Sequence, residues 1–138
     1  MISNLSHVTL VVADLERSAA FYRDVLGFTE VPTPPSFTHA VRWFVSGSAE
    51  LHLIAARDAP QEPGDKAAHP DPSRDIGRAR HVAFGVADLE GMLARLRRRG
   101  VQVLLGPRPR GDGVTQMYCM DPDGHLIELH TPYEVPGL

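Results

Sequence analysis

One phrase occurs twice in this chain, and that duplication constrains the fold most. Residues 7–16 read HVTLVVADLE and residues 81–90 read HVAFGVADLE, so seven of ten positions are identical at an offset of 74 residues. A repeat of this kind predicts two copies of one supersecondary unit, which bury their apolar faces together. Each copy opens on a histidine, His7 in the first and His81 in the second.

Each copy reads as a strand followed by a capped helix. Asp14 is an N-cap in the first copy, and Gly27 ends the helix; Asp88 and Gly100 take these places in the second copy. Apolar residues recur at helical spacing between the caps. They are Leu15, Ala19, Tyr22 and Leu26 in the first helix, and Leu89, Leu93 and Leu96 in the second.

Three strand-like runs follow each helix. They are FTEV, AVRWFV and ELHLIA in the first copy, and VQVLL, TQMYCM and LIELH in the second. The DPDG sequence at 121–124 predicts a hairpin turn before the last run. We therefore predict one α+β domain, residues 1–138, built from two βαβββ modules at 1–56 and 79–138. The Pro-rich, charged residues 57–78 are predicted to be a linker or a flap over a site.

Composition excludes several classes of function. A net charge of −3 and a pI near 6.1 give no basic surface for nucleic acid. No apolar run approaches the roughly 18 residues of a membrane span, so no membrane partner is expected. Cys119 is the single cysteine, and no signal-peptide pattern precedes the first strand, so we expect a cytoplasmic protein. We expect Cys119 to be packed and unreactive.

Strand parity separates the side chains that face the helix from those on the opposite, open face. His52 lies 45 residues after His7 and Glu128 lies 47 after His81, so the two positions correspond approximately. Ten residues before them lie Arg42 and Tyr118, which are expected on the same open face. The residues predicted there are His7, Thr9, Arg42, Glu50 and His52 in the first module, and His81, Gln116, Tyr118 and Glu128 in the second.

Imidazole and carboxylate groups on these faces favour a metal site. A lone histidine on a strand is more often structural, but two related histidines, a third histidine and a glutamate all occupy open faces. If the two faces meet, the four groups converge on one cleft. The predicted ligands are His7, His52, His81 and Glu128. The expected cofactor is a divalent ion, and these ligand types suit Fe, Ni, Co, Zn or Mn without selecting one.

Three segments resemble the vicinal oxygen chelate superfamily: LSHVTLVVADLERSAAFYRDVLGF, RARHVAFGVADLE and YCMDPDGHLIELH. That superfamily includes glyoxalase I, methylmalonyl-CoA epimerase, extradiol dioxygenases, fosfomycin resistance thiol transferases and bleomycin resistance proteins. The resemblance implies paired βαβββ modules forming a curved mixed sheet around a divalent metal. Its ligand positions match His7, His81 and Glu128, with a fourth at or near His52. It also implies a homodimer.

The fourth ligand position is where this chain departs from the pattern. Glyoxalase I has glutamate there and the epimerase has glutamine, whereas this chain has His52, with Glu50 on the same face. A carboxylate or imidazole beside the metal can move a proton on carbon, so Glu128, His52 and Glu50 are the candidate catalytic residues. Alternatively, His7, His81 and Glu128 alone form a two-histidine, one-carboxylate site, as in non-haem iron oxygenases, and His52 is an outer acid or base.

The predicted function is a metal-dependent lyase or isomerase acting on a small molecule that chelates the metal through neighbouring oxygens. A ring-cleaving Fe(II) dioxygenase is an alternative, although extradiol enzymes are usually longer. A fosfomycin thiol transferase is another, since Thr9, Tyr118 and DPDGH resemble that group, but RPRGDGVTQ lacks its serine-rich potassium loop. The last is a drug-binding protein of the bleomycin resistance kind, whose members typically lack the ligand set.

Four side chains are the predicted substrate contacts: Tyr118, Arg42, Gln116 and Thr9. An arginine and a phenol suit an anionic, oxygen-rich ligand, although Tyr118 packed on its strand is the alternative. Trp43 could close a cavity edge. The other histidines are predicted on the surface or in turns: His39, His69, His125 and His130.

Overall fold

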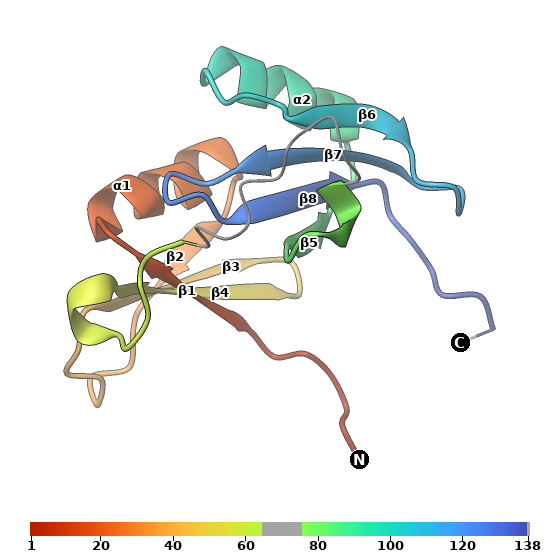
Figure 1. Cartoon of the computed structure of the whole chain (residues 1–138). Coiled ribbons are helices and arrows are strands. Elements are labelled where there is room, and N and C mark those ends of the chain that lie inside the picture. The colour runs from red at the N-terminus through yellow and green to blue at the C-terminus, as the bar shows by residue number, and fades with distance from the viewer. Residues whose placement is uncertain (65–75, 138) are drawn as a thin grey trace. The chain divides into compact units, whose positions relative to one another are not determined.

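The computed structural model describes residues 1–64 and 76–137 of the 138-residue chain. The chain divides into two compact units, Met1–Asp65 and Lys66–Leu138, each carrying one copy of the repeat (Figure 1). Residues 65–75 of the predicted linker or flap, with His69, lie outside the described residues. Among the helices of residues 1–64 and 76–137, none is both long and apolar enough to cross a membrane.

The first unit is one βαβββ module. Its elements are β1 (Val8–Val12), α1 (Leu15–Ala20), a π-helical turn (Phe21–Val25), β2 (Thr29–Val31), β3 (Val41–Ser46), β4 (Ala49–Ala55) and a 3-10 turn (Ala56–Asp58). The strands form a mixed sheet in the order β1-β4-β3-β2, with β1 parallel to β4 and the other pairs antiparallel.

The second unit repeats this topology. Its elements are a 3-10 turn (Ile76–Arg78), β5 (Val82–Gly85), α2 (Leu89–Arg98), β6 (Leu105–Pro109), β7 (Thr115–Met120) and β8 (Leu126–His130). The sheet order is β5-β8-β7-β6, with β5 parallel to β8. The prediction of an α+β fold with two βαβββ modules is confirmed, and each module forms a four-stranded mixed sheet of its own.

The predicted helix caps are confirmed. The Asp14 carboxylate accepts a hydrogen bond from the Arg17 backbone N–H at 3.0 Å, and the Asp88 carboxylate accepts one from the Gly91 N–H at 2.9 Å. Each satisfies a backbone donor that the first helical turn leaves unpaired. Gly100 follows α2 with φ of 69°, a left-handed conformation that ends a helix readily only at glycine.

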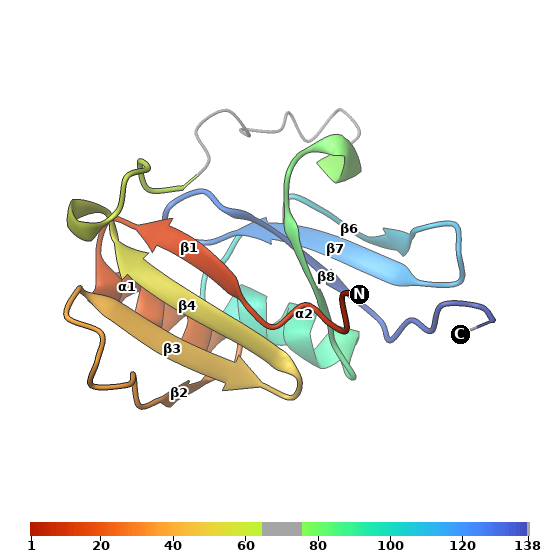
Figure 2. The same cartoon turned by 90° about the horizontal axis from the view of Figure 1, so that it is seen from below.

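The helix-facing sides of the strands form the core of each unit, as strand parity predicts. In the first unit α1 packs on β3 and β4, and it lies behind them in the view of Figure 2. The fully buried residues include Val12, Leu51 and Leu53 in the first unit, and Met117, Cys119, Ile127 and Leu129 in the second. Several open-face residues are buried as well: His52 in the first unit, and Gln116, Tyr118, Leu126 and Glu128 in the second.

One strand prediction was wrong. The sequence VQVLL predicts a strand at 101–105, but β6 begins at Leu105 and runs through Pro109, pairing with β7. Its register shifts between Leu105 and Arg108. A single-sequence pattern favours the β-branched run, whereas the ladder forms where β7 offers free partners, and proline is tolerated because β6 is an edge strand.

Candidate functional site

The open face of the first unit carries a cavity of about 350 Å³. Thr9, Glu50, His52 and Ile54 all line it, so the predicted parity of β1 and β4 is confirmed. The other lining residues are Ser6, His7, Phe37, His39, Val41 and Trp43. His39, predicted as a surface residue, is indeed exposed but also contributes to this lining.

His52 is held between two aromatic rings at the floor of this cavity. The Trp43 ring stacks on it with centroids 4.0 Å apart and planes 6° from parallel. The His7 ring stacks at 4.2 Å and 20°. The register explains the first contact, because Trp43 on β3 lies opposite His52 on β4. The His52 imidazole, 8% exposed, therefore has a fixed orientation and little contact with solvent.

Glu50 orients His52 further. The His52 Nε2 atom lies 2.8 Å from Glu50 Oε1, a distance at which an Nε2–H donates to the carboxylate. This bond leaves the other ring nitrogen, Nδ1, as the atom that can accept a proton or bind a metal. The pair therefore has the form of a base held in place by a carboxylate.

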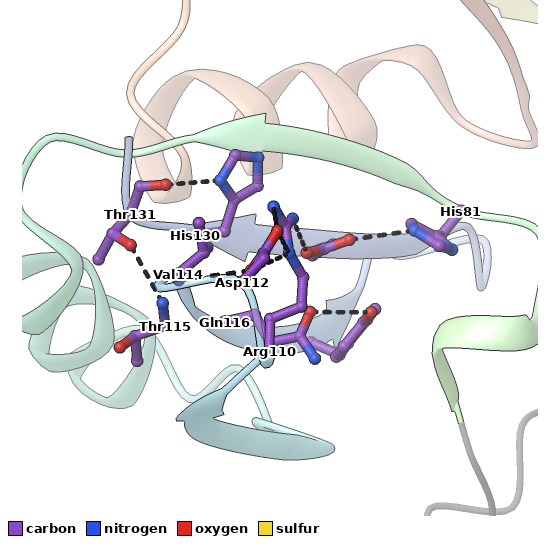
Figure 3. A network of polar contacts seen from close by, with 10 residues as sticks. His81, Arg110, Asp112, Val114, Thr115, Gln116, His130 and Thr131 are labelled. Atoms are coloured by element: carbon purple, nitrogen blue, oxygen red, sulfur yellow. Dashed lines mark hydrogen bonds and ion pairs between the residues drawn. The ribbon is translucent and has the colours of Figure 1, made fainter. Parts of the chain in front are cut away.

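The second unit brings His81 and Glu128 together, as shown in Figure 3. His81 Nε2 lies 3.1 Å from Glu128 Oε2, and His81 Nδ1 lies 2.7 Å from the Ala79 carbonyl oxygen. Because a carbonyl can only accept, Nδ1 carries a hydrogen. In a neutral ring the Nε2 lone pair would then face a carboxylate oxygen. A cation between the two atoms, either a proton or a metal ion, removes that repulsion, so this pair fits a metal site.

Arg110 also contacts Glu128, and the sequence analysis missed it. Glu128 is 4% exposed, and its second oxygen accepts a hydrogen bond from Arg110 Nη1 at 3.1 Å. The Arg110 Nη2 atom also donates to the Asp112 carboxylate at 2.7 Å, and this contact lowers the pKa of Asp112. The sequence RPRGDG, in which charged residues alternate with proline and glycine, could have indicated a charged loop near the site. It could not have shown that Arg110 contacts Glu128, because a sequence does not say which carboxylate an arginine reaches.

Tyr118 and Gln116 lie on the same face as Glu128, as predicted. The register places Tyr118 opposite Glu128, and the Tyr118 hydroxyl donates to Gln116 Oε1 at 3.4 Å. Burial, followed by the neighbouring Glu128 carboxylate, raises the pKa of Tyr118. Its ring packs with Ile76 and Leu126. The packed interpretation of Tyr118 is therefore supported, and its contact with substrate stays a prediction.

Arg42 was placed on the wrong face. Its register partner is Leu53, which faces the helix, and the guanidinium binds Glu30 at 2.6 Å and Glu16 at 2.7 Å. Counting ten residues back from both strands caused the error. The β3–β4 turn has an even number of residues, 47–48, so His52 pairs nine residues back, with Trp43. The β7–β8 connection has an odd number, 121–125, so Glu128 pairs ten residues back, with Tyr118. Trp43 is the residue equivalent to Tyr118.

The register also shows which side chains correspond in the two units. Thr9 and Trp43 flank His52 in the first sheet. Ala83 and Tyr118 flank Glu128 in the same way in the second. The predicted equivalence of His52 and Glu128 is thus confirmed residue by residue. The two copies of the repeat therefore carry different side chains, histidine and glutamate, at the same strand position.

The four predicted ligands divide equally between the units. His7 and His52 belong to the first and His81 and Glu128 to the second. Across residues 1–64 and 76–137, no group of three or more His, Cys, Asp or Glu side chains is arranged to hold a metal ion. Joint ligation of one ion by these residues therefore stays a prediction.

A family model decides the identity of the fold. Residues 4–129 match the Glyoxalase/Bleomycin resistance protein/Dioxygenase superfamily. The chain belongs to this superfamily. The resemblance seen in the sequence is thereby confirmed over nearly the whole chain, as is the expectation of a divalent metal ion as the cofactor that enzymes of this superfamily use.

Similar proteins in this superfamily span several activities. The chain is 31% identical over 135 residues to glutathione transferase FosA of Serratia marcescens, covering 94% of this chain and 82% of that protein. It is 30% identical over 136 residues to an ethylmalonyl-CoA/methylmalonyl-CoA epimerase of Cereibacter sphaeroides, covering 94% and 98%. The crystal structure of fosfomycin resistance protein FosX from Listeria monocytogenes superimposes with a TM-score of 0.70 at 26% identity, covering 96% and 94%.

Proposed function

We propose that this protein is a divalent-metal-dependent lyase or isomerase in which His52, oriented by Glu50, moves a proton on a small substrate. The 2.8 Å contact between His52 Nε2 and Glu50 Oε1 carries this proposal. A base held by a carboxylate in a cavity is the arrangement that proton transfer requires. The proposal includes a metal ion because enzymes of this superfamily use one.

We assign the metal to His7, His81 and Glu128 and leave His52 as the base. His52 has one nitrogen engaged by Glu50 and both ring faces covered by Trp43 and His7. His81 has the opposite character, since its bond to the Ala79 carbonyl directs the Nε2 lone pair toward Glu128. The assignment requires the two open faces to meet around one ion, within one chain or between two copies.

The residues of the chain would divide the reaction as follows. A divalent ion, if held by His7, His81 and Glu128, would supply positive charge that polarises neighbouring substrate oxygens. The Nδ1 atom of His52 accepts a proton from a substrate carbon beside these oxygens and returns it to the neighbouring substrate carbon. Glu50 stabilises the imidazolium while it carries that proton. The Thr9 hydroxyl, which lines the same cavity, can donate to a substrate oxygen.

Metal content tests the ligand assignment. We expect about one divalent ion per chain in protein purified without a tag or oxygen, and loss of that ion in the His81→Ala and Glu128→Gln variants. The matched control is His125→Ala, which removes an imidazole from the β7–β8 connection. If the wild type takes up none of the five candidate ions, the proposal of a metal-dependent enzyme is wrong, and the alternative of a drug-binding protein is favoured.

Proton transfer is tested in deuterated water. We expect the metal-loaded enzyme to exchange or transfer a carbon-bound proton of a 2-oxoaldehyde hemithioacetal or a 2-methyl-branched acyl thioester, and NMR follows the incorporation of deuterium. Glu50→Gln should slow this step at least tenfold while metal content stays unchanged, because the amide cannot stabilise the imidazolium. Equal rates in Glu50→Gln and wild type would contradict the proposed role of Glu50 in stabilising the His52 imidazolium.

A second candidate is the opening of an oxirane ring in a fosfomycin-like substrate. Relatives named FosA and FosX, 31% and 29% identical, favour it. The same His52 would then take the proton of a thiol or water. Phosphorus NMR of fosfomycin with the metal-loaded protein, with and without glutathione, separates this activity from isomerisation. An iron-loaded protein that consumes oxygen with catechols would instead indicate the dioxygenase.

We also propose that the protein is a homodimer, because modules in this superfamily often pair between subunits. Light scattering during gel filtration should give twice the chain mass of 15.1 kDa. A monomeric mass would contradict the dimer, and all ligands of the proposed metal site would then have to come from one chain.

A further inference from the structure

The cavity of the first unit is lined largely by rings. Five of its ten lining residues, those at 7, 37, 39, 43 and 52, are histidine, phenylalanine or tryptophan. We propose that this cavity binds a flat aromatic ring, so that the substrate is an aromatic small molecule. Its identity as the substrate pocket rests on the proposed function, whereas the ring preference is a property of the cavity itself.

The rings already contact one another in the pattern that aromatic side chains favour. Phe37 meets the Trp43 ring edge-on, with centroids 5.3 Å apart at 71°, and meets His39 at 5.5 Å and 63°. Trp43 in turn stacks on His52. Edge-to-face and offset-stacked contacts gain more than the burial of equal aliphatic area, because ring edges and faces carry opposite partial charge. A ligand ring would extend this series of contacts.

Phe37 is an apolar residue of the lining that faces solvent. Its side chain is 41% exposed, one of few large apolar residues left exposed among those described. It lies in the connection between β2 and β3, outside either strand, and reaches Trp43 from there. An apolar ring at the edge of an apolar cavity gains stability when a ligand removes it from water.

The size and polarity of the cavity limit the ligand. A volume of about 350 Å³ falls in the lower part of the range that small-molecule sites occupy. Val41 and Ile54 add apolar wall, whereas Ser6, Thr9 and Glu50 supply the polar groups. The ligand that fits this lining is one aromatic ring with a polar substituent. Aliphatic chains match it less well, because they cannot use the ring faces.

The ring preference can be measured without metal or turnover. The probes are phenol and cyclohexanol, which share a hydroxyl group and ring size but differ in planarity. Each is titrated into the full-length protein in EDTA, and the indole N–H signal of Trp43, the single tryptophan, is followed by ¹H–¹⁵N NMR. We expect phenol to bind roughly three- to tenfold more tightly than cyclohexanol, as aromatic contacts imply. Equal affinities, or no movement of the signal up to the solubility of phenol, would overturn the proposal.

Phe37→Ala supplies the matched variant. It should reduce the affinity for phenol at least threefold, while Val135→Ala, which truncates an exposed apolar residue of the second unit, should leave it unchanged. The loss of the Phe37 ring shifts the neighbouring Trp43 indole signal by itself, so the control for an intact cavity is an amide spectrum of the free Phe37→Ala protein that matches the wild type outside the contacts of residue 37. If this variant binds phenol as the wild type does, the ring site is wrong. Metal uptake is measured separately. A protein that prefers phenol but binds no metal ion overturns only the proposed enzyme. A protein that binds a metal ion but shows no preference for phenol overturns only this inference.

Discussion

At the scale of single residues, two buried polar groups show how environment sets chemistry. Glu128 is nearly inaccessible to solvent yet keeps two partners, His81 and Arg110. Burying a carboxylate without such partners would be costly. Cys119 is also buried, and its burial together with the nearby Asp121 carboxylate favours the neutral thiol.

Removing Arg110 should destabilise the metal-free protein. Arg110→Met removes the guanidinium that donates to the buried Glu128 carboxylate, and we expect the free energy of unfolding in EDTA to fall by about 1–3 kcal/mol. Arg23→Met is the control, since the Arg23–Asp24 pair is about two-fifths exposed on both sides and should contribute little to stability. Urea denaturation measures both. Equal losses in the two variants would mean that Arg110 does not compensate the Glu128 charge.

Cys119 should not react with a thiol reagent in the native state. Burial, and then the nearby Asp121 carboxylate, raises the pKa of its thiol to about 12. We therefore expect Ellman's reagent to find no thiol at pH 8 in native protein and one per chain in urea. The folded state binds this proton more tightly, so stability should fall as pH rises from about 9 toward 12. Rapid labelling of native protein would contradict the packing of β7.

At the scale of elements, the edge strand β6 depends on one glycine. Gly106 has φ of 87°, and a Cβ added there would lie 2.4 Å from the Gln116 carbonyl oxygen and 3.0 Å from the Met117 Cα. The backbone of β7 cannot move away without breaking its pairing with β8. A sequence pattern cannot reveal this approach, because it arises between strands.

Gly106→Ala should therefore cost more than a positive φ alone. Gly113→Ala is the matched control, because Gly113 has φ of 88° and open space around its Cα. Both variants pay for the left-handed backbone, which costs roughly 1–2 kcal/mol. We expect Gly106→Ala to lose a further 1–3 kcal/mol or so from the steric overlap. Thermal denaturation compares the two, and similar melting temperatures would show that β6 shifts freely.

At the scale of the whole molecule, the repeat has diverged in a systematic way. The first unit pairs its histidine, His52, with a carboxylate, and the second pairs its carboxylate, Glu128, with a histidine and an arginine. The two units keep the same strand position, and substitution places an imidazole there in the first unit and a carboxylate in the second. The proposed site needs both.

Metal should therefore couple the unfolding of the two units. If His7 and the pair His81 and Glu128 share one ion, binding stabilises the native state by mass action and joins the units into one cooperative transition. We expect calorimetry to show a single, higher transition with saturating Mn²⁺ or Co²⁺, and a broader or divided one in EDTA. His81→Ala should show the EDTA profile under both conditions. A wild-type profile that ignores the ion would contradict ligation from both units.

The sequence by itself determined the repeat, the helix caps, the strand parity and hence the open-face positions of His7, His52, His81 and Glu128. These are local properties: a cap bonds within four residues, and alternation follows from the pleat of one strand. Only the tertiary structure decided the place of Arg42, the shift of β6 and the partners of Glu128. Each depends on which residue of another strand or loop lies opposite, and a turn of two rather than five residues changes that.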